Sequence, residues 1–259
     1  MNDLLALTIN AHGGMERWKQ FKAVSAHLVN GGVLWNIKGK AGMLDEIDVT
    51  VDLQREWASH TPFGAPNQHT SLEAERVAIE ATDGTVIEEL LHPRSSFKDH
   101  TQQTPWTNLQ LAYFAGYAMW NYLTSPFTFT LPGYEVEEIE PWQENGETWR
   151  RLQVTFPPYI ATHSKVQTFY IDKYGLIRRH DYDVEISGGI PSVHYLWDHT
   201  EVSGIIIPTK RLVYIRQPDL SPLKEPLIVS IQLSDIKFSE LEPAINFQPS
   251  GNELVSGTL

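Results

Sequence analysis

Apolar and polar positions alternate along most of the chain, as they do in β-strands that are buried on one face. In segment 45–53 every second residue is apolar, namely Ile47, Val49, Val51 and Leu53. Such a strand places one face against a core and the other in water. Similar short runs, among them 33–39, continue from residue 24 and are separated by glycine-containing turn signals. This spacing predicts a mainly β protein whose curved antiparallel sheet is built from hairpins.

The segment 1–22 has a helical pattern instead. Asp3 can cap a short helix, and a pair of glycines at 13–14 supplies the conformation that ends helices. A second helical turn carries Trp18 and Phe21 three residues apart, which is the spacing of one helix face. We expect this segment to form a helical cap on the sheet.

Segment 105–125 is apolar in every helical direction, so a helix here must be buried in protein or in lipid. Its length is close to the roughly 20 residues that a membrane span needs. However, Gln110, Gly116 and Asn121 interrupt it, and no basic flank orients it. We expect a buried helix and no membrane span. Two interpretations stay open, a helix of the core and a helix that lies across a ligand pocket.

The composition excludes several classes of function. The chain of 259 residues carries a formal net charge of −12, which repels a phosphate backbone and predicts no nucleic-acid partner. It has no cysteine, and therefore no disulfide, thiolate metal site or cysteine nucleophile. The length suits one β-barrel-like domain over 1–259, and the polar segment 248–259 is expected to be a mobile tail.

The first residues, MNDLLALTINAHGG, lack the basic region, the long apolar run and the cleavage site of a secretory signal. The chain as it stands is therefore expected in the cytoplasm. If Met1 marks an artificial start after removal of a signal, the periplasm is expected instead.

Two hairpins in the second half bring aromatic and polar residues to one face. Closing them at 172–175 and at 188–189 places Gln167 opposite His180 and turns His194 outward. With three residues of the apolar helix, this alternation predicts the side chains that line a concave ligand-binding pocket: His163, Gln167, Phe169, Arg178, His180, Tyr182, Tyr195, Trp197, His199, Tyr113, Tyr117 and Trp120.

These residues have two interpretations. Aromatic walls with a few convergent polar groups are typical of small-molecule pockets. Aromatic residues also favour strands in general, and a buried histidine is often a hydrogen-bonded part of the core. No metal-binding motif accompanies the histidines, no nucleophile elbow surrounds Ser164, and the glycine pairs lack phosphate-binding patterns. We therefore expect no metal, no cofactor and no catalytic residue that the sequence can assign.

Four motifs of the chain resemble the Lol-type lipoprotein carriers. They are AHGGMERW after the first helix, GGVLWNIKG at the start of the β region, the hairpin QTFYIDKYGLIRRHDY, and GIIIPTKRLVYI near the end. The resemblance covers most of the chain. It implies an unclosed antiparallel barrel, with N-terminal and mid-chain helices capping the concave side. It also implies a non-enzymatic carrier or sensor of acyl chains or lipoproteins.

Three hypotheses of function follow from these observations. The first is a non-enzymatic binding protein or carrier for an apolar or amphipathic small molecule or lipid. The second is an enzyme that uses the histidine and tyrosine face on a small substrate, which requires those side chains to converge around an open cavity. The third is a scaffold whose aromatic helix docks a protein partner, which requires the helix to be exposed as an apolar patch.

Overall fold

The computed structural model of the protein describes residues 2–241, so the expected tail at 248–259 lies outside the described residues. Its main element is a 14-stranded sheet. The strands are β1 (Phe21–Gly31), β2 (Glu46–Asp52), β3 (Ala58–Thr61), β4 (Gln68–Glu73), β5 (Arg76–Ala81), β6 (Val86–Leu91), β7 (Glu135–Glu144), β8 (Glu147–Thr155), β9 (Val166–Ile171), β10 (Ile177–Val184), β11 (Ile190–Val202), β12 (Ile205–Arg216), β13 (Pro222–Leu223) and β14 (Val229–Glu240).

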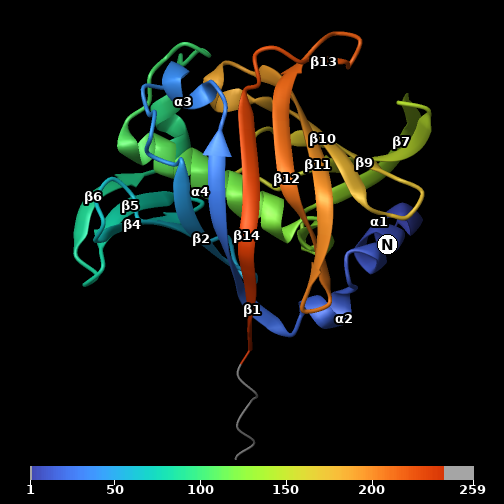
Figure 1. Cartoon of the computed structure of the whole chain (residues 1–259), viewed down its shortest axis with the longest axis horizontal. Coiled ribbons are helices and arrows are strands. Elements are labelled where there is room, and N and C mark those ends of the chain that lie inside the picture. The colour runs from blue at the N-terminus through green and yellow to red at the C-terminus, as the bar shows by residue number, and fades with distance from the viewer. Residues whose placement is uncertain (1, 242–259) are drawn as a thin grey trace, which may run out of the picture.

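Neighbouring strands are antiparallel, in the order β6-β5-β4-β3-β2-β1-β14-β12-β11-β10-β9-β8-β7, and β13 pairs with β12 outside this path. The two ends of the order, β6 and β7, are not paired with each other, so the sheet is curved but not closed (Figure 1). The mainly β, unclosed antiparallel fold is therefore confirmed. The pairing of β1 with β14 joins the first and last strands of residues 2–241 at the centre of the sheet.

Short helices accompany the sheet, and one longer helix lies within its curve (Figure 1). They are α1 (Asp3–Ala11), α2 (Met15–Trp18), α3 (Leu34–Ile37) and α4 (Asn108–Thr124), with short 3₁₀ turns at η1 (Pro93–Phe97), η2 (Phe127–Thr130) and η3 (Glu185–Ser187).

Helix α4 is the buried helix that the sequence predicts at 105–125. It begins with a capping box, in which the Thr107 side chain accepts from the backbone N–H of Gln110 and the Gln110 side chain accepts from that of Thr107. Every residue from position 110 to its end is buried, and it packs mainly against β3, β4 and β5. Among residues 2–241, no helix combines the length and the hydrophobicity that crossing a membrane requires.

The N-terminal elements differ from the predicted cap in detail. The N-cap of α1 is Asn2 rather than Asp3, because the Asn2 side chain accepts from the backbone N–H groups of Leu4 and Leu5. Trp18 ends α2 and Phe21 already begins β1, so these two residues do not share a helix face as predicted. The helical part of the segment is therefore shorter than 1–22.

Segment 33–39, predicted as a strand, forms helix α3. The chain turns at Gly32, whose φ is +99° and where a Cβ atom would lie 2.3 Å from the carbonyl oxygen of Ile228. After this turn the backbone N–H groups of Val33 and Leu34 donate to the carbonyls of Leu227 and Ile228. The close approach ends β1 and directs the next residues across the end of the sheet.

The hairpin between β9 and β10 keeps the predicted face but not the predicted register. Ile171 pairs with Ile177, and a register shift follows, so that His180 lies opposite Phe169 instead of Gln167. The displacement is of two residues, and an even displacement leaves every side chain on its predicted face. Gln167, Phe169 and His180 therefore share the inner face.

The hairpin between β10 and β11 reverses the predicted face of β11. A turn at 188–189 alone would place His180 opposite Trp197. The connection instead spans 185–189 and includes η3, and His180 lies opposite His194. This displacement of three residues is odd, so it turns the side chains of the whole strand to the other face.

Candidate functional site

An apolar cavity lies between α4 and the inner face of the sheet. Side chains of β1, β11, β12 and β14 line it, helix α3 adds Leu34 and Trp35, and Trp106 precedes α4. About 780 Å³ of space lies between the lining atoms, part of it open to solvent. The mostly apolar lining suits an apolar ligand.

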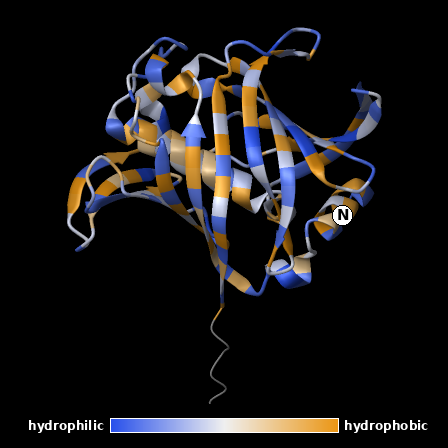
Figure 2. Ribbon diagram, viewed as in Figure 1, coloured by the Kyte–Doolittle hydropathy of each residue, from blue (hydrophilic) through white to orange (hydrophobic). Residues whose placement is uncertain are grey.

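The cavity follows from the residues on the two walls. Ala115 and Ala118 lie three apart on α4, so these two small side chains face the cavity together. On the opposite wall, strand alternation brings Val213 of β12 and Val229 and Ile231 of β14 to the inner face. Figure 2 shows a largely apolar α4 inside strands that carry alternating apolar and polar bands.

The polar part of the wall is a network of tyrosines around His163. The Tyr122 hydroxyl is hydrogen-bonded to His163 Nε2 at 2.8 Å and to the Tyr182 hydroxyl at 2.9 Å. The Tyr117 hydroxyl lies 3.2 Å from His163 Nδ1, and the His163 ring stacks on Tyr182 at 4.0 Å between centroids. Tyr122 and Tyr182 also line the apolar cavity, so the network adjoins its wall.

Burial keeps this network uncharged at neutral pH. It lowers the pKa of His163 to about 3, with a smaller contribution from the Arg94 guanidinium, and raises the pKa of Tyr122 to about 12. Burial also lowers the pKa of His180 and His194 well below the ordinary value. The network can therefore orient a polar group of a ligand by hydrogen bonds, while proton transfer near neutral pH is disfavoured.

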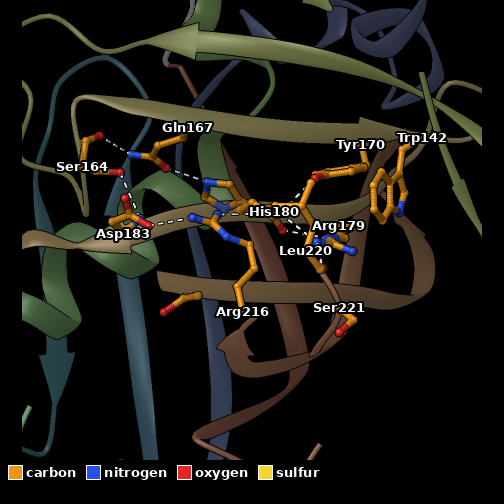
Figure 3. A network of polar contacts seen from close by, with 12 residues as sticks. Trp142, Ser164, Gln167, Tyr170, Arg179, His180, Asp183, Arg216, Leu220 and Ser221 are labelled. Carbon is orange, nitrogen blue, oxygen red and sulfur yellow. Dashed lines mark hydrogen bonds and ion pairs between the residues drawn. The ribbon is translucent and has the colours of Figure 1, made fainter. Parts of the chain in front are cut away.

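Four of the residues predicted for the pocket meet on the inner face of β9 and β10, namely Gln167, Phe169, His180 and Tyr182. The rings of Phe169 and His180 stack at 4.0 Å between centroids, and His180 Nε2 is hydrogen-bonded to Gln167 Oε1 (Figure 3). The Gln167 side chain also donates to the carbonyl of Ser164 at 2.8 Å. Of these four, Tyr182 lines the apolar cavity. Phe169 and His180 line a second, smaller cavity.

Tyr195 and Trp197 do not face the pocket, which corrects the sequence prediction. Tyr195 belongs to a cluster on the outer face of the sheet with Trp149, Tyr170 and Val193. Trp197 is 40% exposed, whereas His194, predicted to point outward, is fully buried. The physical reason is the odd displacement of β11, which exchanges its two faces.

Arg178 and His199 lie together, outside the lining of the apolar cavity. The register shift of β10 falls at Arg178, whose Nε donates to Asp172 Oδ2 at 2.6 Å instead of facing the site beside His180. The Arg178 guanidinium also lies 3.3 Å from His199 Nδ1, and the His199 ring is an edge-on neighbour of His12. Both residues therefore contribute to packing near α1.

The three predicted residues of α4 point in different directions. Tyr117 belongs to the network around His163, as described. The Trp120 indole donates to the backbone carbonyls of Asp52 and Arg55, each at 2.9 Å, and so faces away from the apolar cavity. Tyr113 lines a separate surface hollow that Arg94 also lines. The helix therefore contributes Phe114, Ala115, Ala118, Met119 and Tyr122 to the apolar cavity, a set that the sequence did not single out.

Several polar residues of the cavity lining were not found from the sequence, among them His60 and Lys38. His60 is buried with no hydrogen-bond partner for its Nδ1, and burial lowers its pKa to about 4. Lys38 is fully buried and its Nζ donates to three backbone carbonyls of segment 101–104, at 2.9 to 3.3 Å. Burial lowers the pKa of Lys38 to about 8. Neither residue lies in an alternating run long enough to reveal its face.

The three histidines that the sequence places on one face do not converge on a metal site. His163 is bonded to tyrosines, His180 to Gln167, and His199 Nε2 lies 3.0 Å from the carbonyl of Ile177. Among residues 2–241, no group of three or more histidine, aspartate or glutamate side chains is placed to hold a metal ion.

The sequence matches no family model and no curated protein, but solved structures match the fold. A LolA superfamily protein from Nitrosomonas europaea aligns with a TM-score of 0.53 at 10% identity, over 93% of this chain and 94% of that chain. The chain has a LolA-type fold. A DUF1329 family protein from Desulfovibrio piger aligns with a TM-score of 0.51 at 10% identity, over 91% of this chain and 92% of that chain.

A domain named for outer membrane lipoprotein sorting, from Vibrio parahaemolyticus, aligns with a TM-score of 0.51 at 10% identity, over 92% of this chain and 93% of that chain. All three alignments extend over nearly the whole of both chains. The likeness therefore concerns the entire LolA-type fold, including the sheet and the helix inside its curve. It confirms the fold that the sequence resemblance implied.

Proposed function

We propose that this protein is a non-enzymatic binding protein or carrier, and that it holds the apolar part of a lipid or amphipathic small molecule between α4 and the sheet. The observation that carries this proposal is the apolar cavity. A concave, mostly apolar space with a few polar groups is the usual form of a small-molecule site. The likeness to a domain named for lipoprotein sorting supports the same class of ligand.

The walls favour an amphipathic ligand. Burial of a methylene group contributes about 0.8 kcal/mol, so a short aliphatic chain gains several kcal/mol in a cavity that aliphatic side chains line. The hydroxyls of Tyr122 and Tyr182 offer hydrogen bonds to a polar group of the same ligand.

The enzyme hypothesis has less support from the described residues. Among them, His60 is the one histidine that lines the apolar cavity, and burial lowers its pKa to about 4. It has no carboxylate partner to raise its basicity. The scaffold hypothesis requires an exposed aromatic helix, and α4 is buried along almost its whole length. Binding of an apolar ligand is therefore the function that the geometry supports best.

Filling the cavity tests the proposal. Ala118→Phe adds a ring on the cavity side of α4, so it should weaken the binding of apolar probes. The probes are the neutral dye N-phenyl-1-naphthylamine and dodecanol, which displaces the dye. The affinity for each should fall by about tenfold or more, which is equivalent to the loss of two methylene contacts. The matched control is Ala6→Phe, the same change at a partly exposed position of α1 outside the lining.

Both variants must first show an unfolding transition like that of the parent. Native mass spectrometry of the gently purified parent should also detect a bound apolar compound. If the parent binds neither probe nor dodecanol and carries no such compound, or if folded Ala118→Phe binds them as well as Ala6→Phe does, the proposal is wrong.

A further inference from the structure

The second, smaller cavity shares Tyr122 with the apolar one but has a different lining. His12, Ser125, His180 and Arg211 bring polar side chains to it. About 370 Å³ of space lies between the lining atoms, part of it open to solvent. The cavity therefore suits a small polar group.

Arg211 brings a positive charge to this cavity without a carboxylate to balance it. The residue is 1% exposed, and no carboxylate oxygen of residues 2–241 lies within 4.0 Å of its guanidinium nitrogens. Of its five N–H donors, one at Nη2 donates to the carbonyl of Tyr122 at 2.9 Å, while Nε has no partner. Burial lowers the pKa of Arg211 to about 10, so the group stays charged at neutral pH.

A second buried arginine shows what the usual arrangement looks like. Arg179 is also fully buried, but it donates through Nε and Nη2 to the two carboxylate oxygens of Asp181, at 2.7 and 2.8 Å. Its Nη1 donates to Glu144 at 2.9 Å. Buried charges in proteins are normally paired in this way, because an unpaired one retains its desolvation cost. Arg211 departs from this rule at a cavity.

The groups around Arg211 offset its charge only in part. The Tyr122 carbonyl belongs to the last turn of α4, where the helix dipole places roughly half a negative charge. Burial lowers the pKa of His12 to about 4 and that of His180 well below the ordinary value, so both imidazoles are neutral. Within residues 2–241 the surroundings thus supply dipoles, but no carboxylate oxygen within 4.0 Å of the guanidinium nitrogens.

We propose that this cavity binds a carboxylate group, which pairs with the Arg211 guanidinium. A carboxylate is planar, singly charged and small, and it matches the fork of arginine donors. The carboxylate has two possible sources. It is either a free small acid or the head group of an amphipathic acid whose chain lies in the neighbouring apolar cavity. The first source makes the site independent of the proposed function, whereas the second rests on it.

Isosteric pairs of probes test the charge requirement. Acetate should raise the unfolding temperature of the parent at constant ionic strength, and the neutral isostere acetamide should not. Dodecanoate should bind more tightly than dodecanol if the site takes the head group of a long acid. In Arg211→Met the advantage of each acid over its neutral counterpart should fall by about tenfold or more, because a charge-assisted hydrogen bond is lost. Arg216→Met is the control, since Arg216 is paired with Asp183 and does not line the cavity.

The outcomes separate the two sources from failure. An advantage for acetate alone identifies a small-acid site, and an advantage for dodecanoate identifies the head group of a lipid-like acid. If neither acid exceeds its neutral counterpart, the cavity holds only water and the proposal is overturned, even if dodecanol binds the apolar cavity. The proposal is equally overturned if a folded Arg211→Met variant keeps the full preference for the acids. A purely structural role of Arg211 predicts lower stability in that variant without any change in this preference.

Discussion

Glu56 lies between β2 and β3 as a buried carboxyl group, and its raised pKa should make the free energy of unfolding depend on pH. Its Oε2 accepts a hydrogen bond from the backbone N–H of Ala161 at 2.9 Å, whereas Oε1 has no hydrogen-bond partner. Burial raises the pKa of Glu56 from its ordinary value of 4.5 to about 8, and the nearby Glu75 contributes in the same direction. The folded protein therefore holds a proton on Glu56 at neutral pH.

The sign of the effect on stability follows from proton binding. Between pH 4.5 and about 8 the unfolded chain has an ionised Glu56 while the folded chain keeps the proton, so stability falls as pH rises. Each pH unit inside this window costs about 1.4 kcal/mol of unfolding free energy. Over the whole window the cost approaches ~5 kcal/mol, and it becomes constant once the folded carboxyl also ionises.

The perturbation is Glu56→Gln, which keeps the shape of the protonated group and cannot ionise. We expect the unfolding free energy of the variant, relative to the parent, to rise by about 1.4 kcal/mol between pH 6.5 and 7.5. Urea unfolding at several pH values in this range measures it. The buried histidines, such as His163, and Lys38 also make stability depend on pH, because burial lowers their pKa in the folded protein. These contributions are the same in the parent and the variant, so they cancel in the difference.

The control for this experiment is Glu16→Gln, at a side chain that is 92% exposed. Its unfolding free energy should stay parallel to that of the parent across the pH range. Parallel curves for the parent and Glu56→Gln would refute the reasoning, because they would mean that Glu56 is ionised in both the folded and the unfolded state.

Two further predictions concern β11 and the rim of the apolar cavity. Leu196→Ala should lower the unfolding free energy by about 2–5 kcal/mol, because Leu196 is buried. Trp197→Ala should lower it by less and leave probe binding unchanged, because Trp197 is 40% exposed. Equal losses of unfolding free energy in urea would contradict the register of β11. Lys38→Met should speed amide hydrogen exchange in segment 101–104, because it removes three hydrogen bonds to those carbonyls, and unchanged protection by mass spectrometry would argue against that role.

The sequence was informative wherever the spacing of apolar residues alone decides the type of element or the face of a strand. Alternation over 45–53 identified a half-buried strand, and the absence of any polar face over 105–125 identified a buried helix. The shared face of Gln167 and His180 also survived, although their register did not, because an even displacement conserves the side of the sheet. Fold class and the face of single hairpins are therefore accessible from pattern.

The remaining features depend on lengths that pattern does not determine. The connection between β10 and β11 includes the 3₁₀ turn η3, which displaces the register by an odd number of residues. The sequence prediction did not include this turn, so it assigned Tyr195 and Trp197 to the wrong face of the sheet. Helix α3 follows from the close approach of Gly32 to Ile228, two residues far apart in the sequence. Such contacts are tertiary, and local propensity carries no record of them.

Arg211 shows what the sequence contains once the register is known. On β12 the residues Ile205, Ile207 and Val213 are buried with the same period of two, and Arg211 falls in phase with them. A charged residue in phase with aliphatic ones is directed into the interior, where it needs a partner or a ligand. Its neighbour across the strand pair is Leu196, which is also buried and supplies no charge. No carboxylate of residues 2–241 lies within 4.0 Å of the guanidinium either, and this lack of a charged partner is why we propose a bound carboxylate at this position.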